Sequence, residues 1–375
     1  MLSLSNLLLM TAVPVLLAIV FIATPHPRDI VGFDFRGSLW DPGKAILDGH
    51  NPYLPPHSSA LRTGNPPVYP PVFMLIVAPL TLLPWAIGLA VWLVLMAAAI
   101  GAALWLLNVR DPWIYAIAFS SSPVLIGWQH GNLLLMLLLG LAVSWRWRDQ
   151  PLVAGVSVAA LVAAKLFLWP LLIWLVVTKR VRAALYSAGF VAIAVLGSWA
   201  IIGLDGFRDY PQLLRAYERL YVPHSQSPTA FWISLGLSAT TGAVLAFALG
   251  LTVLLAGVCL ARREDGDRRM FSAAVVAAIA LTPIAWFFFY ALLLVPLALY
   301  RPTLSRIWVI PLAFWIPLVL EDVFSKGVPC CRPAGMSELA WSTLASRPTV
   351  AYLGGCLALW AMTGVVTVVG VRPWR

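Results

Sequence analysis

The chain has 375 residues, of which 61% are hydrophobic and only 11% charged, and its mean hydropathy is +0.89. A soluble domain of this length is about half apolar and about a quarter charged, so a water-soluble globular fold is excluded and lipid must solvate most of the surface. The net charge of +10 does not indicate nucleic-acid binding, because no basic run contains interleaved aromatic residues. Short cytoplasmic loops rich in Lys and Arg account for it instead.

Twelve apolar segments predict membrane-spanning helices. The first is followed by no signal-peptide cleavage site and is expected to be retained. Several others are shorter than the roughly 20 residues of a perpendicular span, so the stretches 112–146, 152–178 and 271–300 are either complete hairpins or broken, re-entrant elements. The predicted spans are 4–24, 86–107, 112–127, 132–146, 152–164, 166–178, 183–203, 241–261, 271–284, 286–300, 307–321 and 349–370.

The basic residues predict how this bundle is oriented. With the N-terminus inside, 14 of the 25 Lys and Arg residues fall in short cytoplasmic connections, which favours hairpins that cross the membrane fully. Both termini are then cytoplasmic, and we expect a multi-pass protein of the cell inner (plasma) membrane. Residues 1–375 form a single integral-membrane domain with external loops at about 25–70, 204–240 and 322–348.

Titratable side chains gather on the predicted external side, which holds all five histidines and ten of the 15 acidic residues. A transporter places its polar site near the middle of the membrane, between internal repeats. No convincing repeat is present, so the polar residues favour chemistry at the external face.

Asp34 lies shortly after the first predicted span, between Phe33 and Phe35. A carboxylate held against the membrane is partly desolvated and is suited to accept a proton from a sugar hydroxyl. The residues alone favour neither this role nor that of an aspartate that caps the next helix or pairs with Arg36. The following stretch, 38–48, is expected to form a short amphipathic helix at the interface.

Lys165 is flanked by apolar residues at the turn of the 152–178 stretch. An ionisable residue at membrane depth is costly, which favours a functional role. An ammonium at the outer bilayer surface suits a lipid-linked phosphate, whereas a lysine that snorkels from a helix end is the structural alternative.

Weaker polar signals lie on the same face. His130 and Asn132 belong to a turn between two predicted spans, which suits either hydrogen bonding to a sugar or a plain polar turn. His224 and Gln226 follow an amphipathic stretch. Trp286 suits either stacking on a sugar ring or anchoring at the membrane interface.

A set of short motifs runs in order from about residue 30 to 300: Asp34, Gly49-His50-Asn51-Pro52-Tyr53, Tyr69-Pro70-Pro71, Ala78-Pro79-Leu80, His130-Gly131-Asn132, Ala154-Gly155, Ala163-Ala164-Lys165, Pro170-Leu171-Leu172, Ser225-Gln226-Ser227 and Thr282-Pro283-Ile284-Ala285-Trp286. Each motif is weak alone, but the ordered set resembles glycosyltransferase family 87. These are integral-membrane enzymes of the GT-C class, whose best-known members include polyprenol-phosphate-mannose-dependent α-mannosyltransferases.

The resemblance implies an all-α GT-C-type bundle of about 12 transmembrane helices that moves a sugar, mannose above all, from a polyprenyl-phosphate donor to a lipid-linked or cell-envelope glycan. Transfer is expected on the non-cytoplasmic face, with inversion and with no cofactor, metal or nucleic-acid partner. Asp34 is the implied general base, and Lys165 and Arg36 the implied phosphate contacts. The implied sugar- or acceptor-binding residues are His130, Asn132, His224, Gln226, Trp286 and Tyr53.

The chain departs from the family pattern directly after Trp286. The mannosyltransferases carry an acidic or polar residue and then histidine there, whereas this chain has Phe287–Tyr290. The role of that histidine is then absent or falls to His130 or His224, and the identity of the sugar stays open. A transporter or flippase for a lipid-linked sugar and an inactive scaffold relative are the competing functions.

Overall fold

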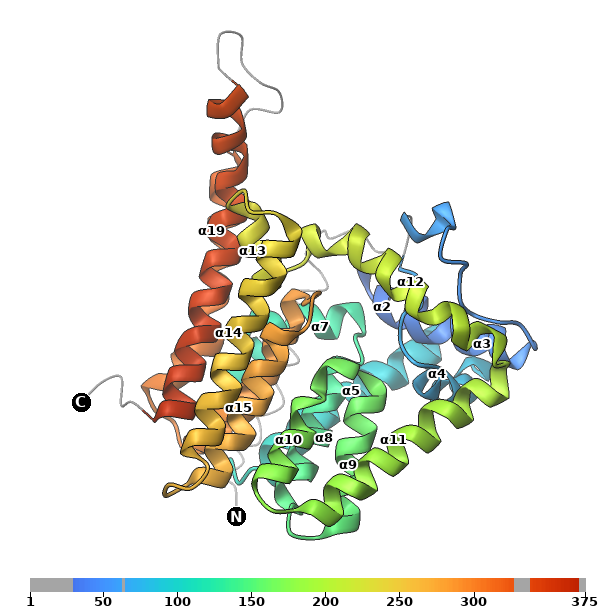
Figure 1. The fold of residues 1–375 in the computed structure, drawn as a ribbon, viewed down its shortest axis with the longest axis horizontal. Helices are drawn as coiled ribbons and strands as arrows, with labels where there is room; N and C mark the ends of the chain where they lie inside the picture. Colours follow the sequence, from blue (N-terminus) through green and yellow to red (C-terminus); the bar gives the residue numbers. More distant parts are fainter. Residues whose placement is uncertain (1–29, 63–64, 327–337, 371–375) are drawn as a thin grey trace.

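The structure is a computed structural model that describes residues 30–62, 65–326 and 338–370, and within these ranges it contains helices but no β-strand (Figure 1). Four helical segments are long and apolar enough to cross a membrane. They confirm an all-helical, membrane-spanning protein. The predicted span 4–24 lies outside the described residues. The four segments are α5 (Trp85–Leu106), α11 (Val181–Ile202), α14 (Ala239–Leu260) and Ser346–Val369, which covers most of α19 (Glu338–Gly364) and the π-helical turn η9 (Val365–Val369).

The remaining apolar sequence forms shorter helices, and proline explains many of the breaks. Proline lacks an amide hydrogen and is tolerated in the first turn of a helix, where it prevents the preceding helix from continuing. The proline-headed helices are α4 (Pro71–Val77), α6 (Pro112–Ser120), α7 (Ser122–His130), α9 (Pro151–Ala164), α10 (Pro170–Val177) and α13 (Pro228–Ser234). Others are α8 (Leu134–Arg146), α15 (Gly266–Leu281), η7 (Phe287–Leu293), α16 (Leu294–Tyr300), η8 (Arg306–Trp308), α17 (Val309–Ala313) and α18 (Trp315–Lys326).

The stretch 112–146 is broken. Helices α7 and α8 meet at an angle of 117°, with the bend at Gly131 and Asn132. Gly131 has φ +68°, a left-handed conformation that glycine adopts without steric cost, so the chain turns sharply there. The bend brings the C-terminal end of α7 and the start of α8 to one point inside the molecule. A straight span across 122–146 is excluded by this angle.

The first helical segment after the predicted first span packs onto this bend. Helix α2 (Phe33–Phe35), the π-helical turn η2 (Arg36–Trp40) and α3 (Asp41–Leu47) follow without a break, so the helix expected at 38–48 is present and begins five residues earlier. Phe35 stacks on Trp92 of α5 at 4.7 Å between ring centroids. The Gly32 amide donates to the Gln129 carbonyl at 2.8 Å, which ties α2 to α7.

The amphipathic stretch before His224 is helix α12 (Asp205–Tyr221), followed by η6 (Val222–His224). Figure 1 shows α12 at the same end of the molecule as α2, α3 and α4. Its tyrosines hold it there, because Tyr210 donates to the Val68 carbonyl at 2.7 Å and Tyr221 donates to the Leu61 carbonyl, in η3 (Ser59–Arg62), at 2.8 Å. Two segments predicted as separate external loops are thereby joined.

We predict that Gly131→Ala lowers the free energy of unfolding by about 1–3 kcal/mol, because alanine is strained at this φ and its Cβ would lie 2.8 Å from the Phe35 Cβ. The measurement is the unfolding midpoint of the purified protein in detergent. Gly101→Ala in α5 is the matched control, since its Cβ would meet no atom within 4 Å. Equal midpoints for the two variants would contradict the packing of α2 on the bend.

Candidate active site

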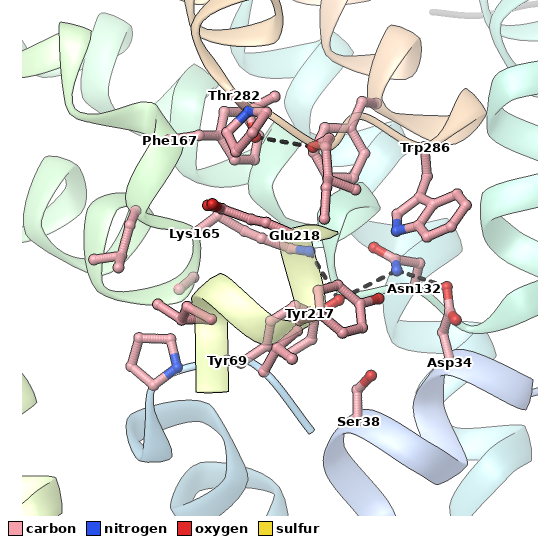
Figure 2. Close-up of a pocket in the computed structure, with 18 of the residues that line it drawn as sticks. Asp34, Ser38, Tyr69, Asn132, Lys165, Phe167, Tyr217, Glu218, Thr282 and Trp286 are labelled. Carbon is pink, nitrogen blue, oxygen red and sulfur yellow. Dashed lines mark hydrogen bonds between the residues drawn. The ribbon is translucent and has the colours of Figure 1, made fainter. Parts of the chain in front are cut away.

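A cavity of about 320 Å³ opens between α2, the chain before α4, the α7–α8 bend, the α9–α10 junction, α12 and the 281–289 segment (Figure 2). One part of its lining is polar and another is apolar. The polar residues are Asp34, Ser38, Asn65, Tyr69, Asn132, Lys165, Tyr210, Tyr217, Glu218 and Thr282. The apolar wall includes Leu166, Phe167, Trp169, Leu281, Trp286 and Phe289.

Asp34 is held in this cavity by two side-chain amides. Asn65 donates to its Oδ1 at 2.9 Å and Asn132 donates to its Oδ2 at 2.7 Å. Burial raises the pKa of the carboxyl above 3.8, against the opposing influence of His130, the two amides and Lys165. The Asp34 side chain caps no helix and forms no ion pair with Arg36, which lies 3.6 Å from Asp41 instead.

Asn132 owes its orientation to the α7–α8 bend. Its Oδ1 accepts from the Leu134 amide at 2.9 Å, at the start of α8, so its NH₂ group faces away from that helix end and toward Asp34. The same Nδ2 lies 3.3 Å from the Tyr69 hydroxyl. The bend therefore aims an amide donor at the carboxylate.

Lys165 is a buried ammonium at the junction between α9 and the short helix η5 (Leu166–Leu168). Its backbone is extended there, and its Nζ donates to the Tyr69 hydroxyl at 2.8 Å. The Nζ also lies 3.9 Å from the centroid of the Tyr69 ring and 5.1 Å from that of Phe289. It forms no ion pair with a carboxylate in the part of the chain that the structure describes, and it is turned into the cavity rather than toward water.

Tyr69 connects these groups, as Figure 2 shows: its hydroxyl accepts from both Lys165 Nζ and Asn132 Nδ2, and the same Asn132 amide donates to Asp34. Burial raises the pKa of the phenol, so it remains a neutral hydroxyl. The Tyr53 hydroxyl donates to the Tyr69 carbonyl at 2.5 Å and fixes its backbone. In the sequence, Tyr69 belongs to the motif Tyr69-Pro70-Pro71, which predicts no role for its hydroxyl.

Glu218 and Asn65 are further cavity residues that sequence analysis missed. Glu218 is half-buried on α12, and burial raises the pKa of its carboxyl while nearby Arg215 lowers it. The amphipathic pattern of α12 was the available signal for Glu218. Asn65 lies in an irregular segment, where no periodicity distinguishes a functional amide from an ordinary loop residue.

The structure brings Asp34, Asn132, Lys165 and Trp286 of the predicted site residues into this lining. Tyr53 lies behind the cavity, stacked on Trp199 at 4.9 Å between ring centroids.

The other predicted residues lie outside the lining. Arg36 is exposed, with its guanidinium 5.5 Å from the centroid of the Trp85 ring. His130 lies 2.8 Å, through its Nδ1, from the Ile126 carbonyl of its own helix. His224 is exposed on η6.

Gln226 supports the segment where the chain departs from the family pattern. Its side-chain oxygen accepts from the Phe287 amide at 3.0 Å, and its backbone carbonyl accepts from the Tyr290 hydroxyl at 2.7 Å. In the same segment, Phe289 stacks on Phe167 at 5.0 Å between ring centroids, and both rings line the cavity. An apolar wall thus occupies this position.

Among residues 30–62, 65–326 and 338–370, no three His, Cys, Asp or Glu side chains come together in a group that could hold a metal ion.

We predict that Tyr69→Phe lowers the free energy of unfolding by about 1–3 kcal/mol, because it leaves the buried Lys165 ammonium without its hydrogen-bond acceptor. Removing both partners in Tyr69→Phe/Lys165→Met should restore part of that loss. Denaturant unfolding of the single and double variants measures the coupling. Strictly additive effects would show that the two side chains do not depend on each other.

A family model described as glycosyltransferase family 87 matches residues 68–288, which is more than half of the 375-residue chain and includes Tyr69, Asn132, Lys165 and Trp286. Asp34 precedes the matched region. Comparison with curated proteins and with solved structures returned no match. The extent of the family match, on a membrane-spanning helical chain, shows that this protein belongs to glycosyltransferase family 87 and is a glycosyltransferase.

Proposed function

We propose that this glycosyltransferase moves a sugar, mannose above all, from a polyprenyl-phosphate donor to a hydroxyl of a lipid-linked or cell-envelope glycan. The observation that supports this most is that one cavity holds both a half-buried carboxyl, Asp34, and a buried lysine amine, Lys165. The first group suits a base and the second suits a phosphate. Tyr69 and Asn132 lie between them, which leaves room for a reacting centre along the cavity.

In the proposed reaction, Asp34 accepts the proton of the acceptor hydroxyl while that oxygen attacks the anomeric carbon. The bond from the anomeric carbon to the phosphate oxygen breaks on the opposite side, so the configuration inverts and polyprenyl phosphate leaves. A carboxylate whose pKa is raised toward the working pH is a stronger base than an ordinary aspartate. Lys165 stabilises the negative charge that develops on the departing phosphate.

The apolar wall supports a lipid-linked donor. Leu166 and Trp169, one and four residues after Lys165 in the chain, line the cavity and are partly exposed, at 46% and 37%. On the surface of a membrane protein such side chains contact lipid, so a polyprenyl chain in the bilayer could carry its phosphate to Lys165. Trp286, on the same lining, is our candidate for stacking on a sugar ring.

We infer that the cavity faces the non-cytoplasmic side of the plasma membrane, with both termini in the cytoplasm. The distribution of charge supports this orientation, because the α8–α9 and α10–α11 connections lie at the end of the molecule opposite α12 (Figure 1). These connections contain Arg148, Lys179, Arg180 and Arg182, which line one cavity there. An enzyme with this orientation has no access to cytoplasmic nucleotide sugars, which favours a lipid-linked donor.

We predict that Asp34→Asn reduces transfer by about 10²- to 10⁴-fold, because asparagine keeps the shape of the side chain but cannot accept the proton. Transfer is measured on purified protein with a polyprenyl-phosphate sugar and a glycolipid acceptor. Donor binding and expression should remain close to wild type. Asp48→Asn, an exposed aspartate at the end of α3, is the control and should stay active.

The pH profile gives a second test of the same role. The base must be ionised and burial raises its pKa, so wild-type transfer should fall as the pH decreases through a value above 3.8. Near-normal turnover of Asp34→Asn would overturn the assignment and make Asp41 the next candidate.

We predict that Lys165→Ala weakens binding of the polyprenyl-phosphate sugar by about 10- to 150-fold, the equivalent of one charge-assisted contact of roughly 1.5–3 kcal/mol. Lys165→Arg should restore part of the affinity because it keeps the charge. Titration of the purified variants with donor lipid measures the change. Unchanged affinity in Lys165→Ala would exclude the phosphate role and leave Arg36 as the next residue to test.

A further inference from the structure

A second cavity, of about 420 Å³, lies where the α8–α9 and α10–α11 connections meet. Four of its lining residues are basic, namely Arg148, Lys179, Arg180 and Arg182, and one is acidic, Asp149. We call this cavity the basic cleft. It lies at the opposite end of the molecule from α12 and shares no lining residue with the Asp34 cavity.

Two of the four cations, Arg148 and Arg180, are held in place by ion pairs. Arg180 donates through Nη1 and Nη2 to the two oxygens of Asp267, at 2.9 Å each, and through Nη2 to Asp149 at 2.7 Å. Arg148 Nε donates to Asp267 at 2.9 Å, and Trp174 Nε1 donates to the same carboxylate at 2.8 Å. Asp267 belongs to α15, so this network joins the α8–α9 and α10–α11 connections to that helix.

The other two cations, Lys179 and Arg182, are exposed and form no ion pair with a described residue. Four basic side chains face only two carboxylates, Asp149 and Asp267, so the cluster keeps two positive charges unbalanced. The ion pairs of Arg148 and Arg180 fix the shape of the cleft. Lys179 and Arg182 have hydrogen-bond donors that can contact an anion.

The end of α10 fixes the backbone that carries the two exposed cations. Lys179 has φ +62° directly after α10, the left-handed conformation in which helices commonly end. The Lys179 amide donates to the Val176 carbonyl at 3.0 Å and the Arg180 amide donates to the Leu175 carbonyl at 2.7 Å, so the start of the α10–α11 connection is held in one conformation beside the cleft.

The basic cleft lies at the level where an apolar span begins. Val181, in the first turn of α11, is 53% exposed, and Leu185, one turn further, is 67% exposed. Leu152 at the start of α9 is 56% exposed. Such side chains next to the cleft are solvated by lipid tails, so the cations lie at the height of the phospholipid headgroups.

We propose that the basic cleft binds the headgroup of an anionic phospholipid, with Lys179 and Arg182 contacting its phosphate. Basic pockets between membrane helices recognise such headgroups, because phosphate supplies the charge and the acyl chains remain in the bilayer. The positive-inside rule explains basic residues in a loop but not the cavity that they line. This proposal does not depend on the donor, the acceptor or the orientation given above.

The test uses the purified full-length protein and native mass spectrometry, which counts bound lipids at defined concentrations of phosphatidylglycerol or phosphatidylcholine. The test variant is Lys179→Gly/Arg182→Gln, in which glycine relieves the backbone strain, so loss of folding does not confuse the result. The control is Arg262→Gln/Arg263→Gln, which removes two exposed charges from the α14–α15 connection, outside the cleft.

Wild type and control should bind phosphatidylglycerol with equal affinity and prefer it to phosphatidylcholine, while the test variant should lose roughly 10- to 100-fold in affinity. Equal phosphatidylglycerol binding by test and control variants would overturn the proposal. Inorganic phosphate supplies the second arm. If it displaces phosphatidylglycerol at equal concentration, the cleft binds free anions rather than a lipid, which would also overturn the proposal.

Discussion

The site depends on one hydrogen bond, the contact of 2.7 Å between the Asn132 amide and Asp34 Oδ2. It joins a helix near the start of the described chain to a bend almost 100 residues later, and it requires the left-handed turn at Gly131. Without that turn, α7 and α8 would form one straight helix and Asn132 would lie on its side rather than at its broken end. The position of Asn132 in the cavity therefore depends on the backbone conformation of Gly131.

The same bend explains why the polar side chains are tolerated in so apolar a protein. A carboxyl removed from water pays a desolvation cost unless donors satisfy its oxygens. Asn65 and Asn132 each satisfy one oxygen, yet burial still raises the pKa of Asp34. Lys165 receives less compensation, since it donates to the neutral Tyr69 hydroxyl rather than to a carboxylate. The stability gained by the apolar bundle is partly offset by the cost of removing these two ionisable groups from water.

The sequence predicted the spans of about 22 residues closely, because long apolar runs leave no alternative in a bilayer. It could not decide how short, proline-headed segments such as α7 and α10 are arranged, since that depends on packing rather than on hydropathy. Asp34 and Lys165 were identifiable because charge beside apolar sequence is costly wherever the chain folds. Tyr69, Asn65 and Glu218 were not, because a polar residue near a loop becomes informative only when the fold gives it a partner.

The two ends of the molecule use charge in opposite ways. Around Asp267, arginines and carboxylates satisfy one another directly, which fixes the connections between α8, α9, α10, α11 and α15. In the Asp34 cavity the charged groups do not pair with each other, and neutral amides and a phenol separate them instead. A paired carboxylate and ammonium would each neutralise the other and have little to offer a substrate. Separation leaves a carboxyl at one side of the cavity and a lysine amine at the other, which is the distribution that the attacking hydroxyl and the departing phosphate of the proposed reaction would require.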